Sequence, residues 1–398
     1  MRTIKLFFIL IFASFSLQAA THDSIMIDKS NYQMYLDLSR QYYKEYRYKQ
    51  ALNLLEQLYR YDSTNIQITN QLGELYVGLN SKKNALFYLG KTLRQDSLNL
   101  FALIASGDIY LRNGDPGVAQ AYYFQVINYV DSNNYYAYKQ IANSYYGMGY
   151  EMYGFALEFY NKAVNCNPYD IASFSRIGNI YNVFDHYRQA DSICTVGLKN
   201  DTLNSSLLNI KAYALYNMKI YSEAAANFDL VLQKGDTIPF NLKYSGLSYF
   251  NLNDYPKALF FLERCIVYDS TDFDPYIVLG QICLQMNDWE KGLTYLNKAE
   301  KLHYPPPRKS AEIFKAMAGI YNEQKEWNKA IECFQQAYKM NPDDKTLICK
   351  LAYQYDFLKQ KDKAIALYTQ LIATADSSIY VEEVKLAKSR LKRLKTNK

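Results

Sequence analysis

The sequence predicts an all-α solenoid of about ten helical hairpins closed by a C-terminal capping helix, and three observations predict it. Small residues recur, mostly every 34 residues, where the second helix of each expected hairpin begins. Large apolar residues follow at spacings of three and four, which place them on one helical face. Asn-Pro or Asp-Ser pairs end many of the second helices. A fixed period of this length is the signature of a repeat architecture.

Residues 1–20 are predicted to be a secretory signal peptide. Arg2 and Lys5 form a short basic start, Leu6 to Phe15 is almost wholly apolar, and the segment 16–20 supplies small residues for cleavage. An uncleaved anchor is the alternative, although the apolar run is short for a membrane span. We therefore expect an exported protein, with residues 21–31 as the lead-in to the first repeat.

Each hairpin has one small residue on its first helix and another on its second helix. The first usually lies twelve residues before the second. Both are small because antiparallel helices approach closely only where side chains are small. The fourth hairpin has two extra residues between Gly147 and Gly154. The second-helix series is Ala51, Ala85, Ala119, Ala156, Ala190, Ala224, Ala258, Gly292, Ala330 and Ala364. Repeats are predicted to start near 32, 66, 100, 135, 171, 205, 239, 273, 311 and 345.

This pattern resembles the tetratricopeptide repeat (TPR) family across residues 32–378. The best single match is 311–344, which has Phe314, Met317, Ala318, Tyr321, Ala330, Phe334, Ala337 and Pro342 at the family's signature positions. The resemblance implies a right-handed superhelix whose first helices line the concave side, the surface on which such repeats bind partners. The high Tyr and Asn content and the Asp-Ser repeat ends resemble exported TPR proteins of Gram-negative Bacteroidetes, which implies the periplasm.

Residues 379–398 are predicted to form a basic capping helix. Tyr380, Val384, Ala387, Leu391 and Leu394 recur on one helical face that can close the last hairpin. Seven of the chain's positive charges lie between 385 and 398. This basic run is either a solvated face or a weak contact with an anionic membrane surface. Nucleic acid is not an expected partner, because its binders carry basicity on the fold surface and not only in a tail.

The concave face of repeats four to seven is the predicted binding groove. Asn side chains can pair with the N–H and C=O groups of an extended peptide, Tyr and Phe supply flat contact area, and Lys139 and Lys243 can meet acidic groups. The alternative is that these residues only follow the overall composition. The predicted groove residues are Tyr136, Lys139, Asn143, Tyr146, Asn179, Asn182, Asn209, Tyr213, Tyr216, Asn217, Lys243, Phe250 and Asn251, with Ser175 and Phe240 on the same face.

No pattern in the sequence indicates an enzyme, a metal site or a cofactor. The three histidines (His22, His186 and His303) lack neighbouring ligands at metal-binding spacing. Phosphate loops and nucleophile elbows are absent from the sequence. The six cysteines are unclustered, and disulfides remain possible for Cys265 with Cys283 and for Cys333 with Cys349.

The sequence therefore predicts a non-catalytic protein–protein interaction scaffold of the bacterial cell envelope that binds an extended peptide in its concave groove. The alternative function is a glycan- or lipid-associated surface binding protein, because Tyr and Asn also line sugar sites.

Overall fold

The computed structural model describes residues 26–302 and 306–396, and in these residues the chain forms 21 α-helices and no strand. This confirms the predicted all-α solenoid of helical hairpins. The chain divides into two compact units, residues 1–177 and 178–398. The predicted signal peptide lies outside the described residues. No helix that the structure describes is long and apolar enough to cross a bilayer.

Four hairpins make up most of the first unit. Their helices are α2 (Tyr32–Lys44) with α3 (Tyr48–Tyr61), α4 (Ile66–Gly78) with α5 (Lys82–Gln95), α6 (Leu100–Arg112) with α7 (Pro116–Gln125), and α8 (Tyr135–Gly147) with α9 (Tyr153–Cys166). A π-helical turn, Val126–Val130, continues α7, and a 3-10 turn, Tyr150–Met152, precedes α9. The boundary between the units falls inside α10 (Ile171–Val183).

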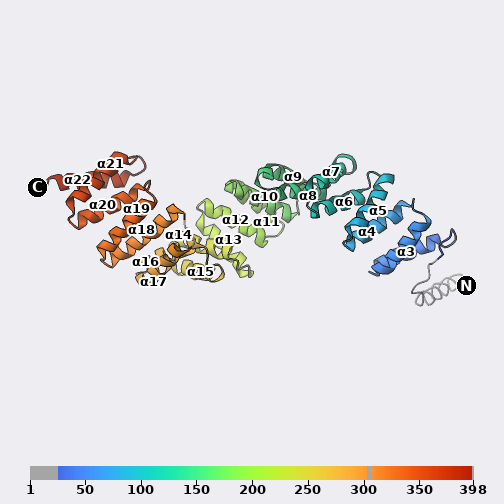
Figure 1. The fold of residues 1–398 in the computed structure, drawn as a ribbon, viewed down its shortest axis with the longest axis horizontal. Helices are drawn as coiled ribbons and strands as arrows, with labels where there is room; N and C mark the ends of the chain where they lie inside the picture. The colour runs from blue at the N-terminus through green and yellow to red at the C-terminus, as the bar shows by residue number, and fades with distance from the viewer. Residues whose placement is uncertain (1–25, 303–305, 397–398) are drawn as a thin grey trace. The chain divides into compact units, whose positions relative to one another are not determined.

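The second unit continues the same pattern and ends on a single helix (Figure 1). Its helices are α11 (Tyr187–Leu198), α12 (Ser205–Asn217), α13 (Tyr221–Gln233), α14 (Pro239–Asn251), α15 (Tyr255–Tyr268), α16 (Phe273–Gln285), α17 (Trp289–Lys301), α18 (Pro307–Glu323), α19 (Trp327–Met340), α20 (Lys345–Phe357), α21 (Lys361–Thr374) and α22 (Val381–Thr396).

Within each unit a helix packs against its hairpin partner and against the next hairpin. In the first unit α4 contacts α5, α3 and α6, and in the second unit α14 contacts α15, α13, α12 and α16. First helices of successive hairpins therefore adjoin one another and form one face of each unit. Such nearest-neighbour packing defines a solenoid.

The first-helix glycines are required by close packing within the hairpins. A Cβ on Gly107 would lie 2.7 Å from the Tyr123 ring, and one on Gly280 would lie 2.5 Å from Leu296. In each case the opposing side chain comes sixteen residues later, four residues after the second small residue. The structure thus refines the expectation that two small residues face each other, since the first-helix glycine makes room for a large side chain.

The turn inside a hairpin places one residue in the left-handed region. In the second hairpin Asn80 has a φ of 55°, and the N–H of Ser81 donates to the carbonyl of Tyr76. This is the Schellman pattern that ends helices. The same conformation recurs at Tyr46, Gly114, Asp185, Lys219, Asn253, Asn287, Lys325 and Lys359.

Six of the described first helices begin at side-chain caps. Asn65 accepts hydrogen bonds from the N–H groups of Gln67 and Ile68, and Asn99, Asn134, Asn204, Asp272 and Asp344 cap their helices similarly. Such caps satisfy N–H groups that have no partner inside the helix. Helices α2, α14 and α18 have no such cap. Helix α18 begins at Pro307 rather than near 311, since proline is well suited to the first helical position.

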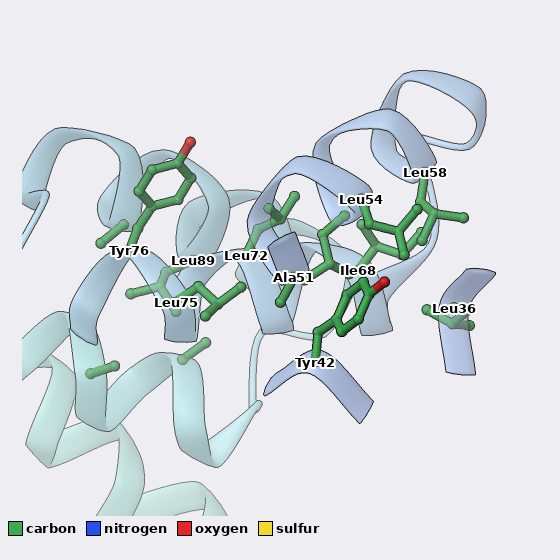
Figure 2. Packing of buried hydrophobic residues seen from close by; sticks show 14 of the residues in the cluster. Leu36, Tyr42, Ala51, Leu54, Leu58, Ile68, Leu72, Leu75, Tyr76 and Leu89 are labelled. Atoms are coloured by element: carbon green, nitrogen blue, oxygen red, sulfur yellow. The ribbon is translucent and has the colours of Figure 1, made fainter. Parts of the chain in front are cut away.

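Apolar core clusters join neighbouring hairpins within each unit. Leu54 and Leu58 of α3 pack with Ile68 and Leu72 of α4, all at most 3% exposed (Figure 2). At the start of the second helix Ala51 is fully buried. Each hairpin therefore covers an apolar face that it cannot bury alone.

Candidate binding surface

The two lysines of the predicted groove are already paired with carboxylates. Lys139 Nζ lies 2.7 Å from Asp170 Oδ1, and Lys243 Nζ lies 2.6 Å from Asp272 Oδ2 and 2.9 Å from Asp274 Oδ2. Each partner comes from the following repeat, about 30 residues later in the chain. These lysines join neighbouring repeats, so they are not free cations awaiting an acidic ligand.

The charges around Lys243 form a small network between α14, α16 and α18. Lys309 lies 3.2 Å from Asp274 and 3.2 Å from Glu312. Burial opposes charge on Lys243, but hydrogen bonds to Asp272 and Asp274 outweigh it and raise the pKa of this lysine. For Asp274, burial favours the neutral acid, yet the bond to Lys243 holds its pKa below the ordinary value.

Most of the predicted asparagines use their amide groups inside the protein. Asn182 donates to the carbonyl of Ile210 at 3.0 Å, and Asn209 donates to Asn241 at 2.5 Å. Asn217 and Asn251 donate to carbonyls one turn back in their own helices, at Tyr213 and Leu247. Asn143 donates to Gln140 and accepts from the Tyr160 hydroxyl. Among the described residues, only Asn179 of this predicted set has no hydrogen-bond partner.

Two predicted groove residues of the first unit are likewise held in place. The Tyr136 hydroxyl donates to Asp108 at 2.9 Å, and burial raises the pKa of Tyr136 to about 12. The Tyr146 ring stacks on Tyr153 with centroids 4.8 Å apart, and the Arg176 guanidinium lies over its face. Both tyrosines therefore contribute to packing between repeats.

In the second unit the structure gathers four rings on α12 and α14, which we call the aromatic surface: Tyr213, Tyr216, Phe240 and Tyr244. The Tyr244 ring lies 4.7 Å from Phe240, 5.0 Å from Tyr213 and 5.1 Å from Tyr216 between centroids. Phe240 is 38% exposed, and Tyr213 and Tyr216 are half-buried. Phe250, by contrast, pairs with Tyr255 at the other end of α14.

Tyr244, the central ring of the aromatic surface, is not among the groove residues predicted from the sequence. The predicted groove residues are those that face away from the small residues of the first helices. Lys243 meets this criterion, and Tyr244, the next residue, is left out. A signal was present, because Tyr244 lies four residues after Phe240 and therefore on the same side of the helix.

All six cysteines are free thiols in the structure. Cys194, Cys265, Cys283 and Cys349 are buried, and burial raises the thiol pKa of each. They pack as small apolar side chains.

The fold and its repeat period define a class, the helical-hairpin solenoids. Sequence models of the tetratricopeptide repeat match residues 312–344 and 350–378. These two segments are TPR repeats, and the first coincides with the segment that the sequence analysis ranked best. The comparison with curated proteins found no match.

Several solved structures are similar in fold. YrrB, described as a TPR protein with an unusual peptide-binding site, shares 18% identity and a TM-score of 0.43, covering 48% of this chain and 97% of its own. A tetratricopeptide repeat protein from Parabacteroides merdae shares 18% identity and a TM-score of 0.42, covering 65% and 99%. The APC/C hetero-tetramer Cut9-Hcn1 shares 15% identity and a TM-score of 0.48, covering 94% and 78%. At these identities the likeness concerns the fold alone.

Proposed function

We propose that this chain is a protein-interaction scaffold that binds an extended peptide segment at the aromatic surface of the second unit. The observation that carries the proposal is the group of four rings on two adjoining first helices, partly open to solvent. Aromatic rings give large contact areas at low entropic cost and dominate interface hot spots. The ion-pair network of Lys243, Asp272, Asp274 and Lys309 beside them adds charged groups of both signs.

The contacts within the protein change which ligand we expect at this surface. Lys139, Lys243 and most of the asparagines are occupied by partners inside the protein. Recognition at this surface therefore relies on ring contacts, and a peptide with apolar or proline side chains suits it better than a strongly acidic one.

The test compares two double variants of the full chain. Peptides are first selected from a random displayed library on the unaltered protein, and their affinities are then measured for each variant. Tyr213→Ala with Phe240→Ala removes two rings of the aromatic surface and is expected to weaken binding about tenfold or more, the size of a hot-spot loss. The matched control, Phe260→Ala with Tyr268→Ala, removes one Phe and one Tyr that are 56% and 59% exposed on α15.

Equal affinity losses in both double variants, or no loss in the first, would show that the selected peptides bind elsewhere. A glycan array on the same proteins separates the alternative ligand class: saturable sugar binding that depends on Tyr213 and Phe240, without peptide binding, would replace the peptide proposal.

We further propose that the protein acts in the cell envelope after export, supported by the basic and apolar start of the sequence. Mass spectrometry of the protein purified from its native host should find a chain that begins near residue 21 in the periplasmic fraction. A full-length chain in the cytoplasm would contradict both export and the envelope role.

A further inference from the structure

A cleft of about 590 Å³ lies at the C-terminal end of the second unit, between the last hairpin and α22. Pockets of this size hold small ligands or a few side chains of a partner. The cleft is lined by Tyr353, Asp356 and Phe357 of α20, by Lys359 and Lys361 at the hairpin turn, and by Arg390, Arg393 and Leu394 of α22.

Positive charge dominates this lining, because four cationic side chains face one carboxylate. Arg390 Nη1 lies 3.6 Å from Asp356 Oδ2, which is an ion pair too long for a hydrogen bond. The side chains of Lys359 and Arg393 have no hydrogen bond or ion pair with any residue that the structure describes. The cleft therefore keeps guanidinium and ammonium donors available.

Three lysines on first helices of the same unit differ from Lys359 and Arg393 of the cleft, because each has a carboxylate partner. Lys243, Lys309 and Lys315 each pair with at least one carboxylate of their own or a neighbouring repeat. Those cations hold repeats together, whereas the side chains of Lys359 and Arg393 in the cleft have no acidic partner among the described residues. An anionic ligand would supply the missing charge.

Two partly exposed rings form the apolar part of the cleft. Tyr353 is 42% exposed and Phe357 is 53% exposed, and the Arg390 guanidinium lies 5.3 Å from the centroid of the Tyr353 ring. Trp327 packs against Phe357 at 4.9 Å and holds it in place. Open rings beside guanidinium groups suit a ligand that carries an apolar side chain next to its acids.

We propose that this cleft is a second binding site, and that it takes an acidic peptide segment with an aromatic residue next to two or more carboxylates. Arginine forks match carboxylates in two-bond geometry, and the rings receive the aromatic side chain. A concave, ring-lined site favours a peptide over a flat anionic membrane, which would contact the outer face of α22. This site stands apart from the aromatic surface, on different helices.

The test uses the full chain and a labelled peptide of Asp and Glu residues around one Phe, compared with the same peptide in which Asn and Gln replace the acids. Lys359→Gln with Arg393→Gln removes two cleft charges, and Lys388→Gln with Lys392→Gln removes two charges of α22 outside the cleft. Binding is followed by fluorescence anisotropy at low and high salt.

The expected result is binding of the acidic peptide but not of its amide counterpart, weakened about tenfold by the cleft pair and unchanged by the outer pair. Equal weakening by both pairs would show general charge attraction and overturn the site. Absent binding, or equal binding of the amide peptide, would overturn it as well. The last measurement uses phosphatidylglycerol vesicles. If the double variant Lys359→Gln with Arg393→Gln abolishes vesicle binding and the unaltered protein does not bind the peptide, the occupant is a lipid headgroup and the peptide proposal fails.

Discussion

Single tyrosine residues pack their rings in the core and donate hydrogen bonds from their hydroxyl groups to nearby carboxylates. The chain contains 41 Tyr and only 20 Phe. The Tyr123 ring is fully buried while its hydroxyl donates to Asp108 at 2.6 Å, and Tyr249 and Tyr295 donate in the same way to Asp229 and Glu263. A phenylalanine in these places would remove one hydrogen-bond donor from each carboxylate. The tyrosine excess therefore has a structural reason.

The Gly107–Tyr123 contact gives a residue-scale prediction. In Gly107→Ala the new methyl group would lie 2.7 Å from a ring that cannot move without breaking its bond to Asp108. Overpacking costs about 1–3 kcal/mol, and the better helix preference of alanine returns less than that. We expect the variant to unfold at lower denaturant concentration, followed by circular dichroism.

Gly90→Ala is the matched control for this substitution. Gly90 lies inside α5, and a Cβ there would meet no atom within 4 Å. Only the helix preference acts, so this variant should be more stable by about 0.5–1 kcal/mol. Shifts of the same sign in both variants would show that the contact with Tyr123 does not constrain the hairpin.

Helix α22 packs on the preceding hairpin through one apolar face. Val384 and Ala387 are buried against α20 and α21, while Leu386, their neighbour, is 38% exposed. Helix α22 packs directly on α21 and α20, so an apolar face of that hairpin would remain uncovered without this helix. The structure agrees with the capping role that the repeat pattern predicts.

Two glutamate substitutions on α22 test the capping role. Ala387→Glu buries a carboxylate in the terminal core and should release α22, because an unpaired buried charge costs several kcal/mol. Leu386→Glu makes the same charge change on the exposed face and should shift stability by less than about 1 kcal/mol. Hydrogen exchange measured by mass spectrometry should show faster exchange in α20–α22 for the first variant only. Similar protection in both variants would contradict the cap.

At the scale of the whole molecule, stability is a sum over neighbouring hairpins. Within each unit helices contact their hairpin partners and the neighbouring hairpin, and the chain divides into two compact units. Local interactions of this kind let parts of a repeat protein open separately. We therefore describe its response to pH by spectroscopy and not by a single free energy of unfolding.

Alkaline pH should unfold the hairpins that contain buried tyrosine hydroxyl–carboxylate bonds. The bond to Glu74 and burial raise the pKa of Tyr43 to about 12, and burial and Asp108 do the same for Tyr136. Because the folded pKa lies above the ordinary value of 10.0, this stabilisation is complete below pH 10 and is lost as pH rises toward 12. Raised pKa values of Lys243 and Lys309 act in the same direction.

The measurement follows tyrosinate absorbance and helical circular dichroism in one pH titration. Exposed tyrosines should ionise near their ordinary pKa with the helices intact, and the buried group should ionise later, together with helix loss. Ionisation of all tyrosines in one early step with full helicity would contradict this assignment of buried hydroxyl–carboxylate bonds.

The amino-acid sequence by itself determined the class of fold and the position of most helices. Small residues at a 34-residue period, turn residues and helix caps act within one hairpin, so they can be read along the chain. Ala51, Ala85 and Ala119 lie fully buried where this period places them. The start of α18 at Pro307 and the π-helical turn after α7 were not foreseen, because helix ends depend on local proline and packing effects.

Only the tertiary structure decided which surface residues remain available to a ligand. Lys139 and Lys243 appear free in the sequence, but each meets an aspartate about 30 residues away, on the next hairpin. In the sequence, the cleft cations Lys359 and Arg393 cannot be distinguished from Lys139 and Lys243. In the structure, the described lining of the cleft has only one carboxylate, Asp356, to pair with its cations. The physical reason is that pairing between hairpins depends on distances across the stack, and a repeat period specifies which helices adjoin but not which side chains meet.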